Sequence, residues 1–284
     1  MTTHTFLITS EELNQLLNKD TGSITVFDCR FDLTNSQKGR ELYAQGHIPS
    51  AVYVDLEKDL SGKKNPLLGR HPLPTPSEWS STISKLGISK STLVILYDQL
   101  ENTYSARMWW MLKAVGFNNV RILDGGYTNW LNFGGSISTT IETPKSLPNE
   151  HTFSDFNGLI RMSDVQQNIK APKFTILDAR APERFKGEVE PLDPIAGHIP
   201  GALNRPYKHN LNSENVFKSP SELKEEFSSL LLNPQTIVHQ CGSGVTACHN
   251  LLAMEIAGID GSLLYAGSWS EWCNHSQNPV AVGL

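Results

Sequence analysis

The chain has 284 residues, of which 39% are hydrophobic and 19% charged, so it is long enough for two globular domains of about 140 residues each. Its formal net charge of −5 argues against nucleic acid or an anionic membrane surface as a partner, although a local cationic pocket could still bind an anionic substrate. No apolar run approaches the roughly 20 residues of a membrane span, and Met1–Phe6 lacks the features of a signal peptide, so we expect a cytoplasmic protein.

The cysteines form neither a CxxC pair nor a cluster with zinc-ligand spacing. In a reducing compartment such cysteines are free thiols, and most of them pack as small hydrophobic side chains. We therefore expect no metal site and no cofactor. The four cysteines are Cys29, Cys241, Cys248 and Cys273.

An internal repeat organises the chain. Four segments of the first half recur in the second half, in the same order and with offsets that drift as loop insertions and deletions would produce. The matched pairs are 24–30 with 174–180, 46–51 with 197–202, 93–98 with 236–241, and 125–130 with 267–272. Each half is therefore expected to repeat one fold.

The repeated segments predict the fold class. Their apolar runs are short, β-branched and unalternating, which is typical of strands buried on both faces of a parallel sheet. Helical stretches over 105–115 and 246–257 lie between them, and each is followed by a glycine suited to a helix C-terminus, Gly116 and Gly258. Alternating strands and helices predict an α/β fold, with a parallel sheet flanked by helices in each half.

The same pattern sets the expected domain boundaries. The segment from Glu142 to Glu150 is rich in proline and polar residues and has no periodicity, which indicates a linker over 141–152. The domains are then expected at 5–140 and 153–284. The paired Asp28-Cys29-Arg30 and Asp178-Ala179-Arg180 follow strands in both halves, and we interpret their Asp and Arg side chains as braces for a loop.

One loop of the second half has the pattern of an anion cradle. The strand 236–240 runs into Cys241-Gly242-Ser243-Gly244-Val245-Thr246, and a helix follows. Backbone N–H groups of such a loop, together with the helix dipole, stabilise negative charge, and the glycines permit close approach and unusual backbone angles. A cysteine at the start of the loop is favoured as the reactive thiolate, although a buried structural cysteine beside a glycine-rich turn would show the same pattern.

The first half differs at this position. Asp98 replaces the cysteine, and the following Gln99-Leu100-Glu101-Asn102-Thr103 has no glycine and carries a further acidic group. We expect that this loop cannot cradle an anion, that Asp98 is not catalytic, and that the protein has one active site, in the second half. A cysteine phosphatase is disfavoured because it needs an arginine six positions after the cysteine, where this chain has Ala247.

The Cys241–Ala247 loop, the two Gly-His-Ile-Pro segments and Gly267-Ser268-Trp269-Ser270-Glu271-Trp272 resemble the tandem rhodanese-like sulfurtransferases over essentially the whole chain. The resemblance implies two tandem rhodanese-like domains, the first non-catalytic. Within that family the loop is most similar to that of 3-mercaptopyruvate sulfurtransferases, since thiosulfate sulfurtransferases more often have basic residues at its second and third positions. Gly242 and Ser243 offer no cation for a thiosulfate sulfonate.

The resemblance also implies roles for individual residues. Cys241 carries the sulfur as a persulfide, and Ser243 and His71 complete the catalytic group with a carboxylate that aligns best with Glu57, ahead of Asp55 or Asp59. Trp269 and Trp272 are interpreted as core residues, although they could also form a wall of the site. The residues expected to bind the substrate are Gly242, Gly244, Val245, Thr246 and Arg184.

Arg184 is the one substrate-binding arginine that the sequence offers, because 190–194 contains no basic residue where the family has a second. Its alternative role is a surface ion pair with Glu183 or Glu188. The expected function is sulfur transfer from a small-molecule donor, 3-mercaptopyruvate, to a thiol, a thioredoxin-like protein or cyanide. Thiosulfate as donor, and a carrier module that hands persulfide sulfur to a protein partner, remain open alternatives.

Overall fold

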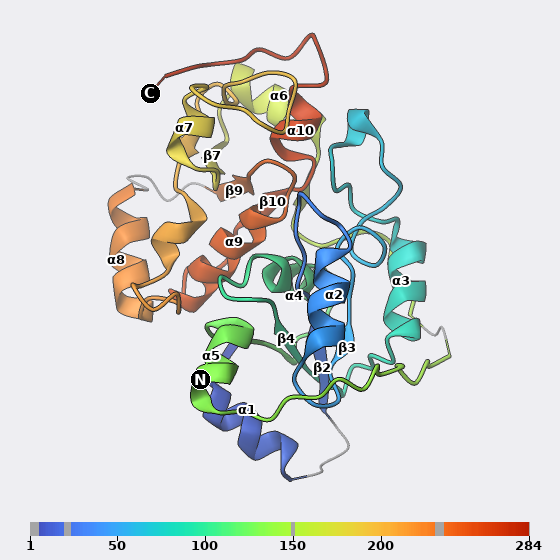
Figure 1. Ribbon diagram of the computed structural model, residues 1–284. Coiled ribbons are helices and arrows are strands. Elements are labelled where there is room, and N and C mark those ends of the chain that lie inside the picture. Colours follow the sequence, from blue (N-terminus) through green and yellow to red (C-terminus); the bar gives the residue numbers. More distant parts are fainter. Residues whose placement is uncertain (1–5, 20–23, 149–150, 231–235, 284) are drawn as a thin grey trace. The chain divides into compact units, whose positions relative to one another are not determined.

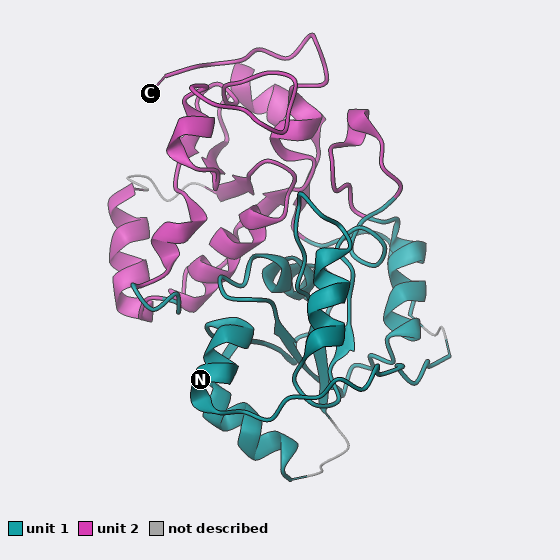
Figure 2. Cartoon of the chain, viewed as in Figure 1, with its two compact units in different colours: residues 1–62, 74–157, 213–217 teal, residues 63–73, 158–212, 218–284 magenta. Residues whose placement is uncertain are grey.

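The computed structural model describes residues 6–19, 24–148, 151–230 and 236–283, and Figure 1 traces them along the chain. Two compact units make up the structure, coloured separately in Figure 2. The first comprises 1–62, 74–157 and 213–217, and the second comprises 63–73, 158–212 and 218–284.

The first unit is built on a five-stranded sheet in the order β1-β5-β4-β2-β3, with every pair parallel. The register places Val26 beside Ile95 and Phe27 beside Leu96 at its centre. Both central strands are almost wholly apolar, as burial on both faces requires. The strands are β1 (Leu7–Ile8), β2 (Ile24–Asp28), β3 (Val52–Tyr53), β4 (Leu93–Tyr97) and β5 (Val120–Leu123).

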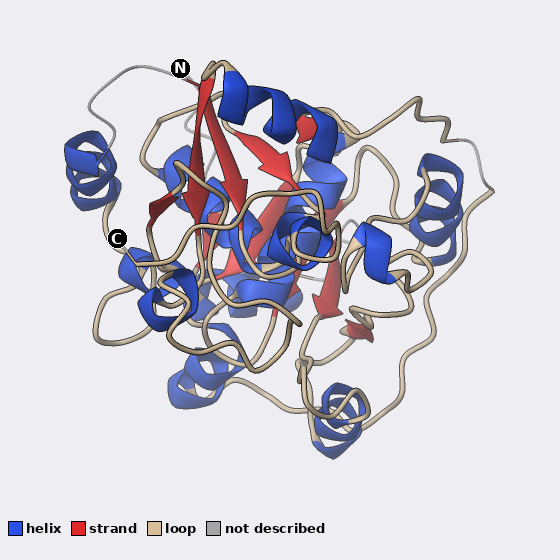
Figure 3. Ribbon diagram, turned by 90° about the horizontal axis from the view of Figure 1, so that it is seen from above, coloured by secondary structure: helices blue, strands red, loops and turns tan. Residues whose placement is uncertain are grey.

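Helices pack against this sheet, and Figure 3 distinguishes the helices of the chain from its strands by colour. Leu13 and Trp130, from the first and last helices of the unit, pack into one buried cluster with Val26 and Ile95. On the other face, Met108 of α4 lies with its sulfur 3.9 Å from the Cys29 thiol, and α4 packs against β4 and β5. The helices are α1 (Ser10–Leu17), α2 (Lys38–Gln45), α3 (Pro76–Lys85), α4 (Thr103–Ala114) and α5 (Gly126–Phe133).

The second unit has the corresponding sheet, in the order β6-β10-β9-β7-β8 and again entirely parallel. Its strands are β6 (Leu159–Ile160), β7 (Phe174–Asp178), β8 (Leu203–Asn204), β9 (Thr236–Gln240) and β10 (Leu263–Tyr265). Its helices are α6 (Met162–Lys170), α7 (Pro182–Phe185), α8 (Pro220–Leu230), α9 (Thr246–Ile256) and α10 (Ser268–Trp272), with two 3-10 turns, η1 (Pro66–Leu68) and η2 (Tyr207–Asn210).

The two sheets confirm the α/β fold that the repeat predicts. The two sheets have the same strand order: β1, β5, β4, β2 and β3 of the first sheet correspond in turn to β6, β10, β9, β7 and β8 of the second. The two predicted helices are also present: α4 and α9 end immediately before Val115 and Ala257, and the following Gly116 and Gly258 have φ of +84° and +71°, as helix-terminating glycines do. In the expected linker, 142–148 contains no helix or strand, and 149–150 lie outside the described residues.

The compact units differ from two contiguous halves in three places. Residues 153–157, expected to open the second domain, belong to the first unit, because Phe156 stacks on Trp110 and the Asn157 N–H donates to the Ala114 carbonyl. The segment 213–217 also joins the first unit, where the Phe217 N–H donates to Asp124. Most important for the site, 63–73 belongs to the second unit.

The paired Asp and Arg side chains after β2 and β7 brace loops. Arg30 binds the Asp28 carboxylate at 2.6 Å and donates to the Gly46 carbonyl at 2.7 Å. In the second unit, Arg180 binds Asp178 at 2.7 Å and donates to the Gly197 carbonyl at 2.8 Å. Each buried ion pair thus ties the end of a central strand to the Gly-His-Ile-Pro turn of its own unit.

Candidate active site

Cys241 begins the loop between β9 and α9, and the backbone around it is held on both sides. Its side chain is buried, with 2% exposure. The Cys241 N–H donates to Ser268 Oγ at 3.0 Å, and its carbonyl accepts from the Trp269 N–H at 3.0 Å. The next carbonyl, of Gly242, accepts from the Ser270 N–H at 2.9 Å. The start of α10 therefore fixes the first turn of the loop, so the thiol has a defined direction.

The rest of the loop passes into α9 through a glycine that the geometry requires. Gly244 has φ of +73°, and a Cβ there would lie 2.3 Å from the Ala266 carbonyl oxygen. Both facts exclude other residue types, as the sequence predicts for a tight anion-binding turn. Val245 is the N-cap of α9, and Thr246 is its first residue.

Ser243 and His71 are brought together although 172 positions separate them in sequence. His71 Nδ1 lies 2.8 Å from Ser243 Oγ, and both side chains are 5% exposed. His71 reaches the loop because 63–73 packs in the second unit, where the Arg70 N–H donates to Ser270 Oγ at 3.0 Å. Glu57 belongs to the first unit, and its pairing with His71 stays a prediction.

Arg184, at the end of α7, is bound by carboxylates other than those expected for a surface ion pair. The alternative role, an ion pair with Glu183 or Glu188, is not what the structure shows: Arg184 Nη2 binds Glu190 at 2.6 Å and Asp193 at 3.4 Å. Both carboxylates belong to the segment 190–194, which contains no basic residue. They are almost completely buried, at 3% and 2% side-chain exposure.

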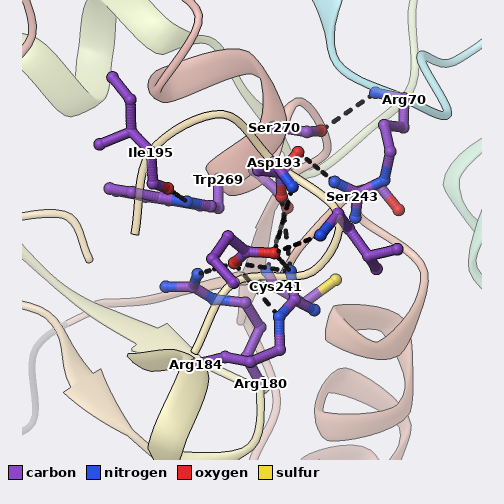
Figure 4. Close-up of polar contacts among 12 residues, drawn as sticks. Arg70, Arg180, Arg184, Asp193, Ile195, Cys241, Ser243, Trp269 and Ser270 are labelled. Carbon is purple, nitrogen blue, oxygen red and sulfur yellow. Dashed lines mark hydrogen bonds and ion pairs between the residues drawn. The ribbon is translucent and has the colours of Figure 1, made fainter. Parts of the chain in front are cut away.

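A second arginine, which the sequence analysis missed, lies beside the first. Arg70 Nη1 binds the other oxygen of Asp193, and Figure 4 shows both guanidinium groups near the loop that carries Cys241 and Ser243. A Cβ built on Gly242 would lie 2.8 Å from Arg70 Nη2 and 3.3 Å from Arg184 Nη1. The loop itself supplies no cation, as its sequence predicts, and both of these cations come from other segments of the chain.

Arg180 adds a third guanidinium behind the loop. Besides Asp178 it contacts Glu190 at 3.4 Å, and it lies over the Trp269 ring at 4.9 Å from the ring centre. Trp269 and Trp272 are fully buried in the hydrophobic core of the second unit, so their interpretation as core residues is confirmed. Trp269 also donates from its indole N–H to the Ile195 carbonyl at 2.9 Å.

The first-half counterpart of the Cys241 loop directs its backbone amides to its own side chain. The Asp98 carboxylate accepts N–H groups from Leu100, Asn102, Tyr104 and Ser105, at 2.8–3.4 Å. Backbone amides do not depend on residue type, and Asn102 adopts a left-handed φ of +57° without glycine. Burial nevertheless raises the pKa of Asp98 to about 6, because desolvation outweighs these four bonds.

The four cysteines are free thiols, as expected. Burial is the main reason why the pKa of Cys29 lies well above its usual value and why that of Cys273 rises to about 11. Cys248, in the first turn of α9, donates its S–H to the Gly244 carbonyl at 3.3 Å. Cys29 and Cys273 are thus disfavoured as thiolates, and Cys248 serves the structure of the loop.

The described part of the chain contains no group of three or more His, Cys, Asp or Glu side chains placed to hold a metal ion. None of the helices among the described residues is both long and apolar enough to cross a membrane.

Comparisons with known proteins agree with this geometry. The model of the rhodanese-like domain family matches twice, at 9–133 and 162–275. A Pseudomonas aeruginosa protein named "Probable 3-mercaptopyruvate sulfurtransferase" is 41% identical over 98% of both chains. Thiosulfate sulfurtransferase of Cricetulus griseus is 32% identical, over 91% of this chain and 88% of the relative.

Among solved structures, 3-mercaptopyruvate sulfurtransferase from Leishmania major superposes with a TM-score of 0.83 at 27% identity, over 95% of this chain and 74% of that one. Two matches of the family model, two parallel sheets of equal strand order and near-complete coverage of the relatives lead to one conclusion. The chain belongs to the rhodanese-like family, as a sulfurtransferase with two tandem domains.

Proposed function

We propose that this sulfurtransferase takes sulfur from 3-mercaptopyruvate, carries it as a persulfide on Cys241, and passes it to a thiol acceptor. The observation that supports this best is the pair formed by Ser243 and His71, 2.8 Å apart and one loop residue away from the cysteine. A hydroxyl bonded to an imidazole can move a proton, which a donor whose leaving group is a carbanion equivalent requires.

In the first half-reaction the Cys241 thiolate attacks the sulfur of 3-mercaptopyruvate. A sulfur–sulfur bond forms, the carbon–sulfur bond breaks, and its electron pair leaves as the enolate of pyruvate. That enolate takes up one proton at carbon to become pyruvate, and in this proposal Ser243, whose hydroxyl is hydrogen-bonded to His71, delivers it. The enzyme is left with a persulfide, so this step is nucleophilic, covalent catalysis without an external oxidant.

In the second half-reaction an acceptor thiolate attacks the outer sulfur of the persulfide. The new sulfur–sulfur bond belongs to the acceptor, and Cys241 leaves as a thiolate, ready for another cycle. The acceptor is a small thiol or a thioredoxin-like protein, and cyanide can replace it in an assay. The cradled Asp98 of the first unit supports the idea that amides of such a loop hold the negative charge of the persulfide.

Thiosulfate is the second candidate donor, and the guanidinium groups beside Gly242 favour it. A sulfonate is an anion that such groups bind well. The carboxylates of Glu190 and Asp193 offset this, because each arginine is already paired with a buried negative charge. A donor with a single negative charge therefore suits the site better than the dianion.

The test compares kcat/KM for 3-mercaptopyruvate and thiosulfate under one set of conditions, in wild type and in Cys241→Ser. We expect a preference for 3-mercaptopyruvate in wild type, complete loss of transfer in the variant, and one added sulfur in the intact mass of donor-treated wild type alone. A preference for thiosulfate would select the second donor. Sulfur loading from a protein donor with no turnover of either small donor would identify a carrier module instead.

A further inference from the structure

The anion-binding part of the site contains two arginines from distant segments that converge on one point. Arg184 lies in the short helix α7, whereas Arg70 follows η1 in the segment 63–73. Both face the position that a side chain on residue 242 would occupy: Arg70 Nη2 is 2.8 Å, and Arg184 Nη1 3.3 Å, from the Cβ that Gly242 lacks. Gly242 directly follows Cys241 in the sequence, so this point adjoins the residue that we propose as the nucleophile.

The nitrogen atoms that face Gly242 are also the ones left available. Arg70 is held through Nη1, which binds Asp193, and Arg184 is held through Nε and Nη2, which bind Glu190. Among the described residues, neither Arg70 Nη2 nor Arg184 Nη1 has a hydrogen-bond acceptor. The side chains are 27% and 18% exposed, so an anion from solvent can reach them.

Asp193 explains how the two guanidinium groups come to point the same way. One of its oxygens binds Arg70 and the other lies 3.4 Å from Arg184, so a single buried carboxylate spans both. Desolvation is the main reason why the pKa of Asp193 is raised, and the bond to Arg70 opposes that shift. A carboxylate is retained in so unfavourable a place when it fixes the groups around it.

We propose that Arg70 and Arg184 together form the site for the donor's carboxylate above Gly242, and that Asp193 positions both arginines. Arg70 thereby supplies the second guanidinium group that the segment 190–194 does not contain. Gly242 is required because any side chain would fill the space between them. This assignment rests on the proposed function, since it presumes a donor with a carboxylate.

The experiment uses two donors that differ only in that group: 3-mercaptopyruvate and mercaptoacetone, in which a methyl group replaces the carboxylate. We expect Arg70→Ala to lower kcat/KM for 3-mercaptopyruvate by about 10- to 150-fold, the effect of one charge-assisted hydrogen bond, and to leave mercaptoacetone at its wild-type rate. Arg70→Lys should recover part of the loss, because an ammonium cannot reproduce the planar fork. Arg40→Ala, which removes an exposed arginine of the first unit, is the control for net charge.

Two further variants separate binding from folding. Gly242→Ala keeps both arginines but inserts a methyl group 2.8 Å from Arg70 Nη2, so it should also lower the preference for 3-mercaptopyruvate over mercaptoacetone. Asp193→Asn removes the charge that orients the arginines. It should raise KM for 3-mercaptopyruvate while kcat stays the same, as expected for a positioning residue.

The outcomes distinguish this inference from the proposed function. Equal losses with both donors in Arg70→Ala, at an unchanged melting curve, would assign Arg70 a structural role and overturn the inference. An unchanged donor preference in both Arg70→Ala and Gly242→Ala would do the same. Wild type that turns over neither mercapto-ketone would instead contradict the proposed donor, before any variant is compared.

Discussion

Replacing Asp98 by asparagine tests whether burial or hydrogen bonding decides the ionisation of a carboxylate held by four backbone amides. Burial outweighs the hydrogen bonds and raises the pKa of Asp98 from 3.8 to about 6. An acid whose pKa is higher in the folded state binds protons more tightly there, so its contribution to stability falls as pH rises from about 4 to about 6. Asparagine cannot ionise and lacks this dependence.

The magnitude follows from the two pKa values. Between pH 5 and pH 7.5 the wild type should lose about 1.4 kcal/mol of unfolding free energy relative to Asp98→Asn, from the linkage of one group that titrates near 6 when folded and near 4 when unfolded. The measurement is the unfolding free energy of both full-length proteins, obtained by denaturant unfolding at several pH values between 5 and 7.5. It is taken from the unfolding transition that the substitution shifts. Comparing the two proteins cancels the groups they share, including Asp124, whose pKa burial also raises to about 6.

A difference between the proteins that does not vary with pH would refute the reasoning. So would the opposite slope, with wild type gaining relative stability towards pH 7.5, because it would mean that the four amide bonds hold the pKa below its usual value. Sulfur transfer is expected to be the same in both proteins, since Asp98 belongs to the unit that we predict to be non-catalytic. A tenfold fall in kcat, about 1.4 kcal/mol, with unchanged stability would mean that both loops act.

Two other substitutions have clear expected results. Gly244→Ala should lower the unfolding free energy, measured by denaturant unfolding, by at least about 2 kcal/mol more than Gly258→Ala does. Both glycines have positive φ, but only a Cβ at position 244 would lie 2.3 Å from a backbone oxygen, that of Ala266. Equal effects of the two substitutions would show that the loop can shift to accommodate the methyl group. Burial lowers the pKa of His239 from 6.5 to about 3, so relative to His239→Leu the wild type should lose about 2.5 kcal/mol of unfolding free energy as pH falls from 7 to 4.5, and a pH-independent difference would contradict that burial.

The sequence predicted the fold well because a repeat supplies independent copies of the same evidence. Buried parallel strands, the helices after β4 and β9, and the terminating Gly116 and Gly258 all follow from local pattern. The loop that carries the proposed nucleophile was predictable for a related reason, since Cys241 begins a strand–loop–helix segment whose geometry is local.

The arginine site could not be predicted in the same way. Which residues accompany the loop depends on where 63–73 packs, and no periodicity encodes a contact between Arg70 and Asp193 across 123 positions. The one available signal was the position of Arg70 directly before His71. The cradle around Asp98 was missed for a different reason: the prediction weighed side-chain charge and glycine content, whereas backbone amides are present whatever the sequence.

The packing of 63–73 has a consequence for how this protein can be divided. A gene fragment that encodes 153–284 contains Cys241, Ser243 and Arg184, yet it lacks Arg70 and His71. Such a fragment keeps the proposed nucleophile but lacks the proposed proton-transfer partner and half of the proposed anion site, and it exposes the surface of α10 to which 63–73 is hydrogen-bonded. Complementation by a peptide covering 63–73, rather than by the intact first domain, is the minimal addition that completes it.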